Sequence, residues 1–348
     1  MKDLKYLAAF SIPAVALMAL QLKGYYAYST VIYAFGVIPV LELLFPQDSR
    51  NLSEEEKEKK AKNLLFDWLL YLNIPFVYGI SIYTLIDLTN NSYALFEIIG
   101  LILSCGIVIG SNGINVAHEL GHRQNKTAQT LAKLLLIPAL YMHFYIEHNF
   151  GHHLNAATKE DPATAKYKQS VYAFWITSVL KQYISAWHIQ KNLLERIGHS
   201  FLSPKNDMFW FTLIQAAFMG IVFLFFGWYG VLIVFTVAIV GILLLETINY
   251  IEHYGLIRKR LASGRYERVQ EIHSWNSNHI IGRIVLYELT RHSDHHYKAN
   301  KKYQLLDYHQ TSPEMPYGYP TSMVMALIPP LWFRVMNKRI PKDMKGAT

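Results

Sequence analysis

The chain has 348 residues, of which 52 % are hydrophobic and 17 % are charged, with a formal net charge of +8 and a mean hydropathy of +0.14. This composition excludes an ordinary water-soluble domain and indicates that lipid solvates much of the surface. The single cysteine, Cys105, excludes an intrachain disulfide and a metal cluster built from cysteines. We expect no nucleic-acid partner.

Long runs without formal charge predict membrane-spanning helices, each of which needs about 20 apolar residues. The longest run lies between Asp207 and Glu246 and is long enough for two helices joined by the turn Gly227-Trp228-Tyr229-Gly230. We therefore predict an all-α integral membrane protein with a single domain over residues 1–348. Its six predicted transmembrane helices lie at roughly 5–22, 25–45, 66–86, 94–117, 209–226 and 230–249.

Charge predicts how these helices are oriented. If the N-terminus lies in the cytoplasm, nearly all of the 33 Lys and Arg residues fall on the cytoplasmic side, as the positive-inside rule requires. The cytoplasmic catalytic segments would then be 118–208 and 250–348. Between His122 and His148, the apolar stretch "LAKLLLIPALYMHFYI" is short and contains Pro138, so we interpret it as re-entrant or interfacial.

Nine of the fifteen histidines fall in four motifs, "HELGH", "EHNFGHH", "NYIEHYGL" and "RHSDHH". Histidines three or four residues apart on a helix share one face and can bind one ion. The predicted topology brings all four motifs to the same membrane face, so we expect them to form one metal site. The nine histidines are His118, His122, His148, His152, His153, His253, His292, His295 and His296.

The number of imidazoles distinguishes between two kinds of metal site. The spacing in "HELGH" also fits a zinc protease, but such an enzyme needs only three ligands and an open position. Nine imidazoles suit two metals with four or five nitrogen ligands each. The absence of cysteine ligands and the need for a redox-active pair favour iron, although composition alone leaves copper open.

Together the four motifs closely resemble the integral-membrane alkane 1-monooxygenase family, within the wider histidine-rich membrane desaturase and hydroxylase group. The resemblance extends to "ATKEDPATA" and "GRYERVQEIHSWNSNH" and covers about residues 60–340. It implies a site of two iron ions at the cytoplasmic end of a helix bundle, with the nine histidines as ligands. It also implies hydroxylation of the terminal methyl group of an alkane, with dioxygen as co-substrate, in the bacterial inner membrane.

Several other polar residues lie close to the motifs in the sequence. Ligating histidines usually donate their second N–H group to a carboxylate or a carbonyl, so nearby carboxylates are candidates for orienting them. The candidates are Glu119, Asp161, Glu252 and Asp294. The remaining histidines lack a partner at ligand spacing, and we interpret them as structural; they are His143, His188, His199, His273, His279 and His309.

Electrons must come from a separate protein, because the chain has no flavin or nucleotide fingerprint and one cysteine cannot hold a rubredoxin iron. The family resemblance implies a rubredoxin, fed by a rubredoxin reductase. We expect this donor to dock on a basic cytoplasmic face. Its candidate residues are Arg258, Lys259, Arg260, Lys298, Lys301 and Lys302. The alternative explanation is that these charges only fix the topology or bind anionic lipid.

Three further functions stay open at this point. A related hydroxylase would act on fatty acyl or alkyl-aromatic substrates. An intramembrane zinc protease would hold one zinc and no iron. A non-enzymatic metal carrier would exchange its metal readily and place polar residues within the spans, which are nearly free of them.

Overall fold

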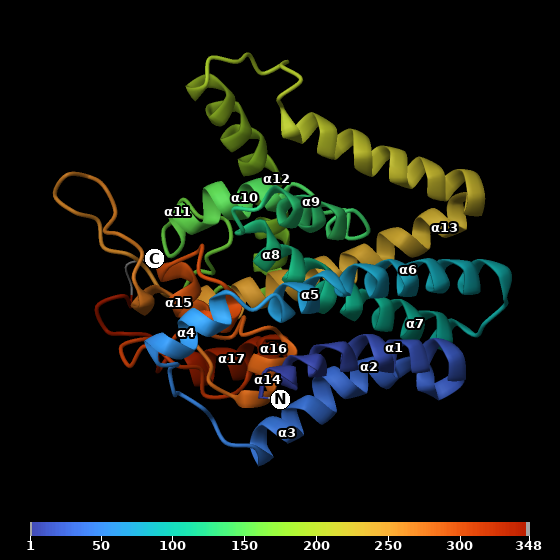
Figure 1. Cartoon of the computed structure of the whole chain (residues 1–348), viewed down its shortest axis with the longest axis horizontal. Coiled ribbons are helices and arrows are strands. Elements are labelled where there is room, and N and C mark those ends of the chain that lie inside the picture. Colours follow the sequence, from blue (N-terminus) through green and yellow to red (C-terminus); the bar gives the residue numbers. More distant parts are fainter. Residues whose placement is uncertain (1, 346–348) are drawn as a thin grey trace. The chain divides into compact units, whose positions relative to one another are not determined.

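The computed structural model describes residues 2–345. All secondary structure elements within these residues are helices, apart from isolated β-bridges (Figure 1). Within these residues the β-structure consists of the isolated bridges Gln47–His279, Arg260–Tyr266 and Asn276–Glu314. The prediction of an all-α fold is therefore confirmed for the described residues.

The helices of the first half of the chain are α1 Ser11–Leu22, α2 Ser29–Ile32, α3 Ile38–Leu44, α4 Glu54–Ala61, α5 Leu65–Tyr71, α6 Asn73–Asn90, α7 Leu95–Val108, α8 Asn115–Gly121, α9 Lys126–Leu135 and α10 Phe144–Glu147. Those of the second half are α11 His153–Asn155, α12 Val171–Arg196, α13 Asp207–His253, α14 Ile280–Val285, α15 His292–Tyr297, α16 Tyr319–Ala326 and α17 Pro329–Met336. Short 3-10 and π segments join or extend them at η1 Lys2–Phe10, η2 Gly24–Tyr28, η3 Tyr33–Val37, η4 Ile109–Ile114, η5 His148–His152, η6 Glu271–His273 and η7 Tyr303–Leu305.

Five helical segments are long and apolar enough to cross a membrane: Asp3–Leu22, Gly24–Leu44, Leu65–Asn90, Leu95–Gly121 and Asp207–His253. The last has 47 residues and is interrupted at Gly227, whose φ of 63° lies in the region that favours glycine. Figure 1 shows α13 reversing its direction. The predicted helices 209–226 and 230–249 lie on either side of Gly227. That the chain crosses the membrane six times and that its metal site faces the cytoplasm remain predictions.

The apolar stretch that follows "HELGH" forms no candidate span. Its helix, α9, ends at Leu135, ahead of Pro138, and the backbone then turns at Leu140, whose φ is 51°. Proline limits the conformation of the residue before it and seldom allows a helix to continue through it. The short, interrupted geometry fits the re-entrant or interfacial interpretation.

The described residues pack into two compact units. One consists of 2–37, 64–147 and 183–245, and we call it the span unit because it contains most of the apolar helices. The other consists of 38–63, 148–182 and 246–345, and we call it the histidine unit because seven of the nine motif histidines belong to it. Whether both units act as one functional domain stays a prediction.

Within the span unit, α7 and the start of η4 approach the second half of α13 closely through glycines. A Cβ atom on Gly106 would lie 2.4 Å from the side chain of Val240, and one on Gly241 would lie 2.6 Å from Ile109. Small residues allow such close packing between membrane helices, where dispersion replaces the hydrophobic effect as the driving force. This contact fixes the helix that leads to "HELGH".

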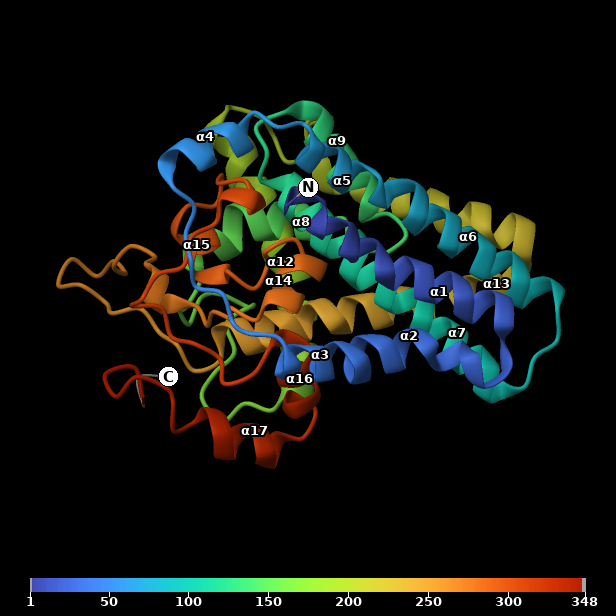
Figure 2. The same cartoon turned by 60° about the horizontal axis from the view of Figure 1, so that its bottom comes forward.

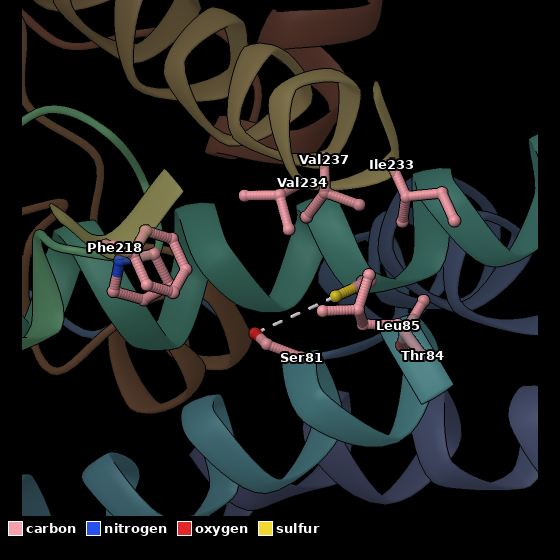
Figure 3. Close-up of a pocket in the computed structure, with 9 residues that line it drawn as sticks. Ser81, Thr84, Leu85, Phe218, Ile233, Val234 and Val237 are labelled. Atoms are coloured by element: carbon pink, nitrogen blue, oxygen red, sulfur yellow. Dashed lines mark hydrogen bonds between the residues drawn. The ribbon is translucent and has the colours of Figure 1, made fainter. Parts of the chain in front are cut away.

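A small apolar cavity lies between α6, α7 and α13 of the span unit (Figure 3). Its lining residues are Ser81, Thr84, Leu85, Cys105, Pro138, Phe218, Ile233, Val234 and Val237. The thiol of Cys105 is buried and lies 4.0 Å from the hydroxyl of Ser81. The cysteine therefore packs inside the membrane-spanning helices.

Within the histidine unit, polar contacts join α12 to the end of α13. The amide of Gln182 donates to both carboxylate oxygens of Glu246 at 2.9 Å, and the indole of Trp175 donates to Thr247 at 3.0 Å. Glu246 and Gln182 are both buried. Since buried polar groups hold their partners in defined positions, these bonds fix the last turns of α13, which end in His253.

Candidate metal centre

Three separate segments deliver seven histidines into the histidine unit. His148 and His152 lie on the π turn η5, and His153 follows directly in α11. Residues four and five apart share a face in the wider π turn, which is frequent at functional sites. His253 ends α13. The third segment is α15, where His292, His295 and His296 are three or four residues apart.

The first group of converging histidines consists of His152, His253, His292 and His296. One ring nitrogen from each lies within 4.8 Å of those of the others, and all four side chains are buried. The Nε2 atoms of His253 and His292 are 3.2 Å apart. Four buried imidazoles that face one another form a nitrogen-lined site of the size of one metal ion.

The second group within this unit consists of His148, His153 and His295, whose ring nitrogens also lie within 4.8 Å of one another. The Nε2 atoms of His148 and His153 are 3.0 Å apart. The ring of His153 stacks on that of His296 with the centroids 4.5 Å apart, so the two groups are neighbours. The arrangement therefore offers two adjacent metal sites.

Hydrogen bonds fix which nitrogen of two rings is available to a metal. His152 Nδ1 lies 2.9 Å from the buried carboxylate of Asp161, which also accepts from the hydroxyl of Thr164 at 2.6 Å. His253 Nδ1 lies 3.4 Å from the backbone carbonyl of His273. In both rings the Nδ1 atom is engaged and the Nε2 atom faces the other histidines, which is the usual arrangement of metal-ligating histidines.

The nitrogens fit a metal on three further observations. His152 Nε2 and both ring nitrogens of His296 are buried without a hydrogen-bond partner, a costly state that coordination would relieve. A metal that holds two imidazole nitrogens at about 2.1 Å and at a right angle separates them by about 3.0 Å, close to the spacings above. Burial, helped by neighbouring imidazoles, lowers the pKa of His296, which favours the neutral, ligating form.

The four candidate carboxylates have different surroundings. Asp161 contacts His152, as described, and Glu252 Oε2 lies 3.2 Å from His292 Nε2. Asp294 accepts hydrogen bonds from Lys301, His309 and the backbone of Asp307, which ties α15 to the segment that follows it. Glu119 forms an ion pair with Arg123 at 2.7 Å in the span unit.

Burial opposes the acidity of Asp161, but its neighbour outweighs that effect. Desolvation alone would raise the pKa of this carboxyl, while His152, in ion-pair and hydrogen-bond contact with it, holds the pKa below its usual value. A charged Asp161 favours a proton on His152 Nδ1 and leaves Nε2 as the ligand atom.

His118 and His122 lie in the span unit, at the end of the segment Leu95–Gly121 and just beyond it. They are one helical turn apart, and their ring centroids are 5.1 Å apart. The π segment η4 directly precedes α8 and widens the helix before the motif. The pair therefore presents two imidazoles to a common point, as the spacing of "HELGH" predicts.

Comparison with known proteins covers nearly the whole chain. Residues 92–325, which include all nine motif histidines, match the model of the fatty acid desaturase family. The chain belongs to this family. It is 38 % identical to alkane 1-monooxygenase 2 of Alcanivorax borkumensis over 99 % of this chain and 93 % of that protein. Alkane 1-monooxygenase 1 of Pseudomonas aeruginosa is 37 % identical over 91 % of this chain and 84 % of its own length.

A more distant relative is the hydroxylase component of xylene/toluene monooxygenase from Pseudomonas putida. It is 26 % identical over 99 % of this chain and 90 % of that protein. The resemblance to alkane 1-monooxygenases that the motifs indicate is thus confirmed.

The histidines outside the motifs have other surroundings in this desaturase-family chain. His143 is buried between Tyr141 and Tyr183 in the span unit. His279 contacts Ser277 and Gln47, and His199 contacts Lys205. Two others lie closer to the candidate ligands. The backbone carbonyl of His273 contacts His253, and the side chain of His309 contacts Asp294, which is next to His295 in the sequence.

One buried residue near the site is absent from the sequence-based candidates. The hydroxyl of Tyr319 is buried near Glu252, and burial followed by this carboxylate raises the pKa of the phenol. Tyr319 begins α16, far from every histidine motif, so no spacing rule could have indicated it.

The six basic residues expected to bind an electron donor differ in exposure. Arg258 is 8 % exposed, and its guanidinium donates to the carbonyls of Leu154, Ala156 and Glu267. Lys301 forms ion pairs with Asp294 and Asp307. These two side chains support the histidine unit from inside, whereas Lys259, Arg260 and Lys298 are exposed and Lys302 is half-buried.

Proposed function

We propose that the protein is an oxygen-dependent membrane monooxygenase that converts medium- or long-chain alkanes to 1-alkanols with two bound irons. The observation that carries this proposal is the pair of converging histidine groups in a chain whose relatives include alkane 1-monooxygenases. Bound iron would supply the oxygen activation that no side chain can perform. The chain would supply the ligands that position the irons and the apolar surroundings of the site.

The proposed ligand set follows the two groups. His152, His253, His292 and His296 would hold one iron, and His148, His153 and His295 would bind the other. We propose that His118 and His122 complete the second ligand set, since their paired rings and the family resemblance support that role. Asp161 and the carbonyl of His273 orient the first set, and Glu252 lies beside His292.

An alkane has no polar group for a protein to recognise. Its binding must come from burial of methylene groups, at about 0.8 kcal/mol for each. The apolar spans place the protein where such molecules dissolve, so the substrate reaches it through the bilayer. Membrane helices therefore serve here as the route of supply as well as the anchor.

Metal analysis of purified protein tests the proposal directly. We expect two irons per chain, and His253→Ala should lose iron and hydroxylation together, because His253 contacts both His152 and His292. His188→Ala is the matched control, since His188 is exposed on α12 and should leave both readouts unchanged. One zinc without iron in fully active protein would support the protease alternative instead, and readily exchanging metal would support the carrier.

The substrate class is tested separately from the metal. The relative that carries the name xylene/toluene monooxygenase favours an alkyl-aromatic hydroxylase as the second candidate function. Whole cells supplied with an alkane series, fatty acids and alkyl-aromatics should yield mainly 1-alkanols. Preferential oxidation of the methyl group of an aromatic substrate would reverse the order of the two candidates.

We also propose that a separate rubredoxin supplies the electrons and docks on an exposed hairpin. Residues 258–268 form this hairpin, closed by the bridge Arg260–Tyr266, with the turn at Gly264. It carries four exposed cations, Lys259, Arg260, Arg265 and Arg268. Opposite charges steer such weak encounters, and about 0.1 M salt shortens their reach to about 10 Å.

Charge reversal on the hairpin tests the docking surface. Arg265→Glu with Arg268→Glu should raise the donor concentration needed for half-maximal rate several-fold while the iron content stays constant. Lys59→Glu with Lys62→Glu changes the net charge equally at the exposed end of α4 and should have little effect. Equal effects of both pairs, or no salt dependence in either, would contradict docking at the hairpin.

The proposed location is the bacterial inner membrane, with six crossings and the metal site on the cytoplasmic face. A C-terminal green fluorescent protein fusion should fluoresce, and a C-terminal alkaline phosphatase fusion should be inactive, because both reporters would lie in the cytoplasm. The opposite pair of results would place the C-terminus outside.

A further inference from the structure

The histidine unit exposes apolar side chains that no internal contact explains. On the first half of α12, Ile176 is 66 % exposed and Leu180 is 61 % exposed. With Tyr172 they follow a spacing of four residues and therefore form one stripe along the helix. Farther along α12 the same face carries His188, Lys191, Asn192 and Glu195, which are polar and exposed. The outer face of this helix thus changes from apolar to polar near its middle.

The corner between α16 and α17 exposes a second apolar surface. Val324, Leu327, Ile328 and Leu331 are all exposed there. The hydroxyl of Tyr172 donates to the carbonyl of Leu327 at 2.7 Å, which places the start of α12 beside this corner. The two surfaces are therefore continuous.

The same surface continues to the end of a candidate membrane span. Helix α3 ends the segment Gly24–Leu44, and its Val40, Leu43 and Leu44 are exposed. It packs against α16, as Figure 2 also shows, where the side chain of Glu42 lies against Gly318. The apolar surface of α16, α17 and α12 therefore adjoins the end of a segment that is suited to lipid.

Cations flank the apolar surface in the sequence. Arg334 lies on α17 and Lys338 lies two residues beyond its end, and both are exposed. Lys166 and Lys168 precede α12 and are also exposed. Apolar residues bordered by lysine and arginine are typical of helices that lie in the membrane interface, where the cations reach the phosphates of the headgroups.

We propose that α3, the α16–α17 corner and the first half of α12 form a lipid collar by which the histidine unit sits in the apolar layer of one leaflet. We define the lipid collar as Val40, Leu43, Leu44, Val324, Leu327, Ile328, Leu331, Tyr172, Ile176 and Leu180. The occupant is the bilayer itself, with Arg334 and Lys338 at headgroup depth. None of these residues is a proposed ligand, and the proposal does not depend on which substrate is oxidised.

Depth measurements on the full chain in phospholipid nanodiscs test the collar. Cys105 is the single cysteine and is buried, so Cys105→Ser gives a background for labelling one position at a time. A nitroxide is attached to Leu180→Cys or Leu331→Cys, with Ile82→Cys, exposed in the middle of the candidate span Leu65–Asn90, as the reference. Its collision rates with dioxygen and with a water-soluble nickel chelate are compared, because dioxygen concentrates in the apolar layer and the chelate in water.

Labels at Leu180 and Leu331 should show a dioxygen-to-nickel ratio several-fold above that at Lys59→Cys and Arg265→Cys, which are exposed and polar. Labels at Arg334→Cys and Lys338→Cys should give intermediate ratios. Ratios at Leu180 and Leu331 equal to those at Lys59 would overturn the proposal, and so would protection from both reagents, which would indicate a protein partner. Ile176→Cys and Ile328→Cys replace any variant that does not fold, as judged by its metal content. The measurement needs no turnover, so it stands apart from the test of the hydroxylase.

Discussion

Asp161 contacts the candidate metal ligand His152, so we expect it to act on the metal site through that ring. It accepts from His152 and from the hydroxyl of Thr164, and it is buried. Asp161→Asn keeps the shape but removes the charge that holds the proton on His152 Nδ1. Loss of such an orienting partner typically costs about 10- to 100-fold in metal affinity or activity. We expect the iron dissociation constant of Asp161→Asn, measured by competition with a chelator, to rise in that range.

The neighbouring Glu160 provides the control for Asp161. It is exposed, and Glu160→Gln removes the same charge one residue away. Iron affinity and turnover of this variant should match those of the unmodified protein. If both variants weaken iron binding equally, the effect would come from net charge near the site and not from the bond to His152.

At this scale the sequence predicts much of the site. The motifs include all seven histidines that converge in the histidine unit, because ligand spacing on helices is a local property. Asp161 is among the nearby carboxylates expected to orient them. Tyr319 and the carbonyl of His273 escaped prediction. Their contacts with Glu252 and His253 join distant segments, and a backbone carbonyl has no signature in the sequence.

At the scale of helices, the contact between α7 and α13 depends on glycine. A side chain at Gly106 would meet Val240 at 2.4 Å and the backbone carbonyl of Val237 at 3.1 Å, so the two helices must separate to accept it. Overpacking of this kind typically costs about 1–3 kcal/mol. Gly106→Leu should therefore lower the thermal unfolding midpoint in detergent by several degrees.

Gly220 gives a matched control on α13, since a Cβ atom there meets nothing within 4 Å. Gly220→Leu adds the same volume in a membrane helix and should leave the midpoint unchanged or raise it, because glycine is a poor helix former. A similar loss of stability in both variants would show that the midpoint does not report the α7–α13 contact.

The spans illustrate which elements a sequence predicts. The expected helices 5–22, 25–45, 66–86 and 94–117 lie within a few residues of four candidate spans, because uncharged runs of that length have few other uses. Helix α12 was not predicted as an element, although it has 26 residues. Its outer face mixes apolar and charged residues, and no single periodic pattern covers both halves. The π turns η4 and η5 also escaped prediction, since their sequences read as ordinary helix.

At the scale of the whole molecule, the histidine unit packs several buried imidazoles against one another. His152 Nε2 and both nitrogens of His296 have no hydrogen-bond partner, and burial lowers the pKa of His296. Folding must then place several polar rings close together without water, which is unfavourable unless a ligand binds them. Metal binding is expected to offset this unfavourable free energy of burial, because an ion that binds only the folded chain stabilises it.

Removal of the metal should therefore lower stability as well as abolish turnover. Protein stripped with a chelator under reducing conditions should unfold at a lower temperature than the iron form. Added Zn²⁺ should restore the unfolding midpoint without restoring hydroxylation, because zinc accepts the same nitrogens but has no redox chemistry. The His253→Ala variant should respond less to either metal, since it lacks a ring that contacts both His152 and His292. Equal midpoints with and without metal would mean that the imidazoles are packed independently of any ion, and a zinc form that hydroxylates would exclude iron as the oxidant.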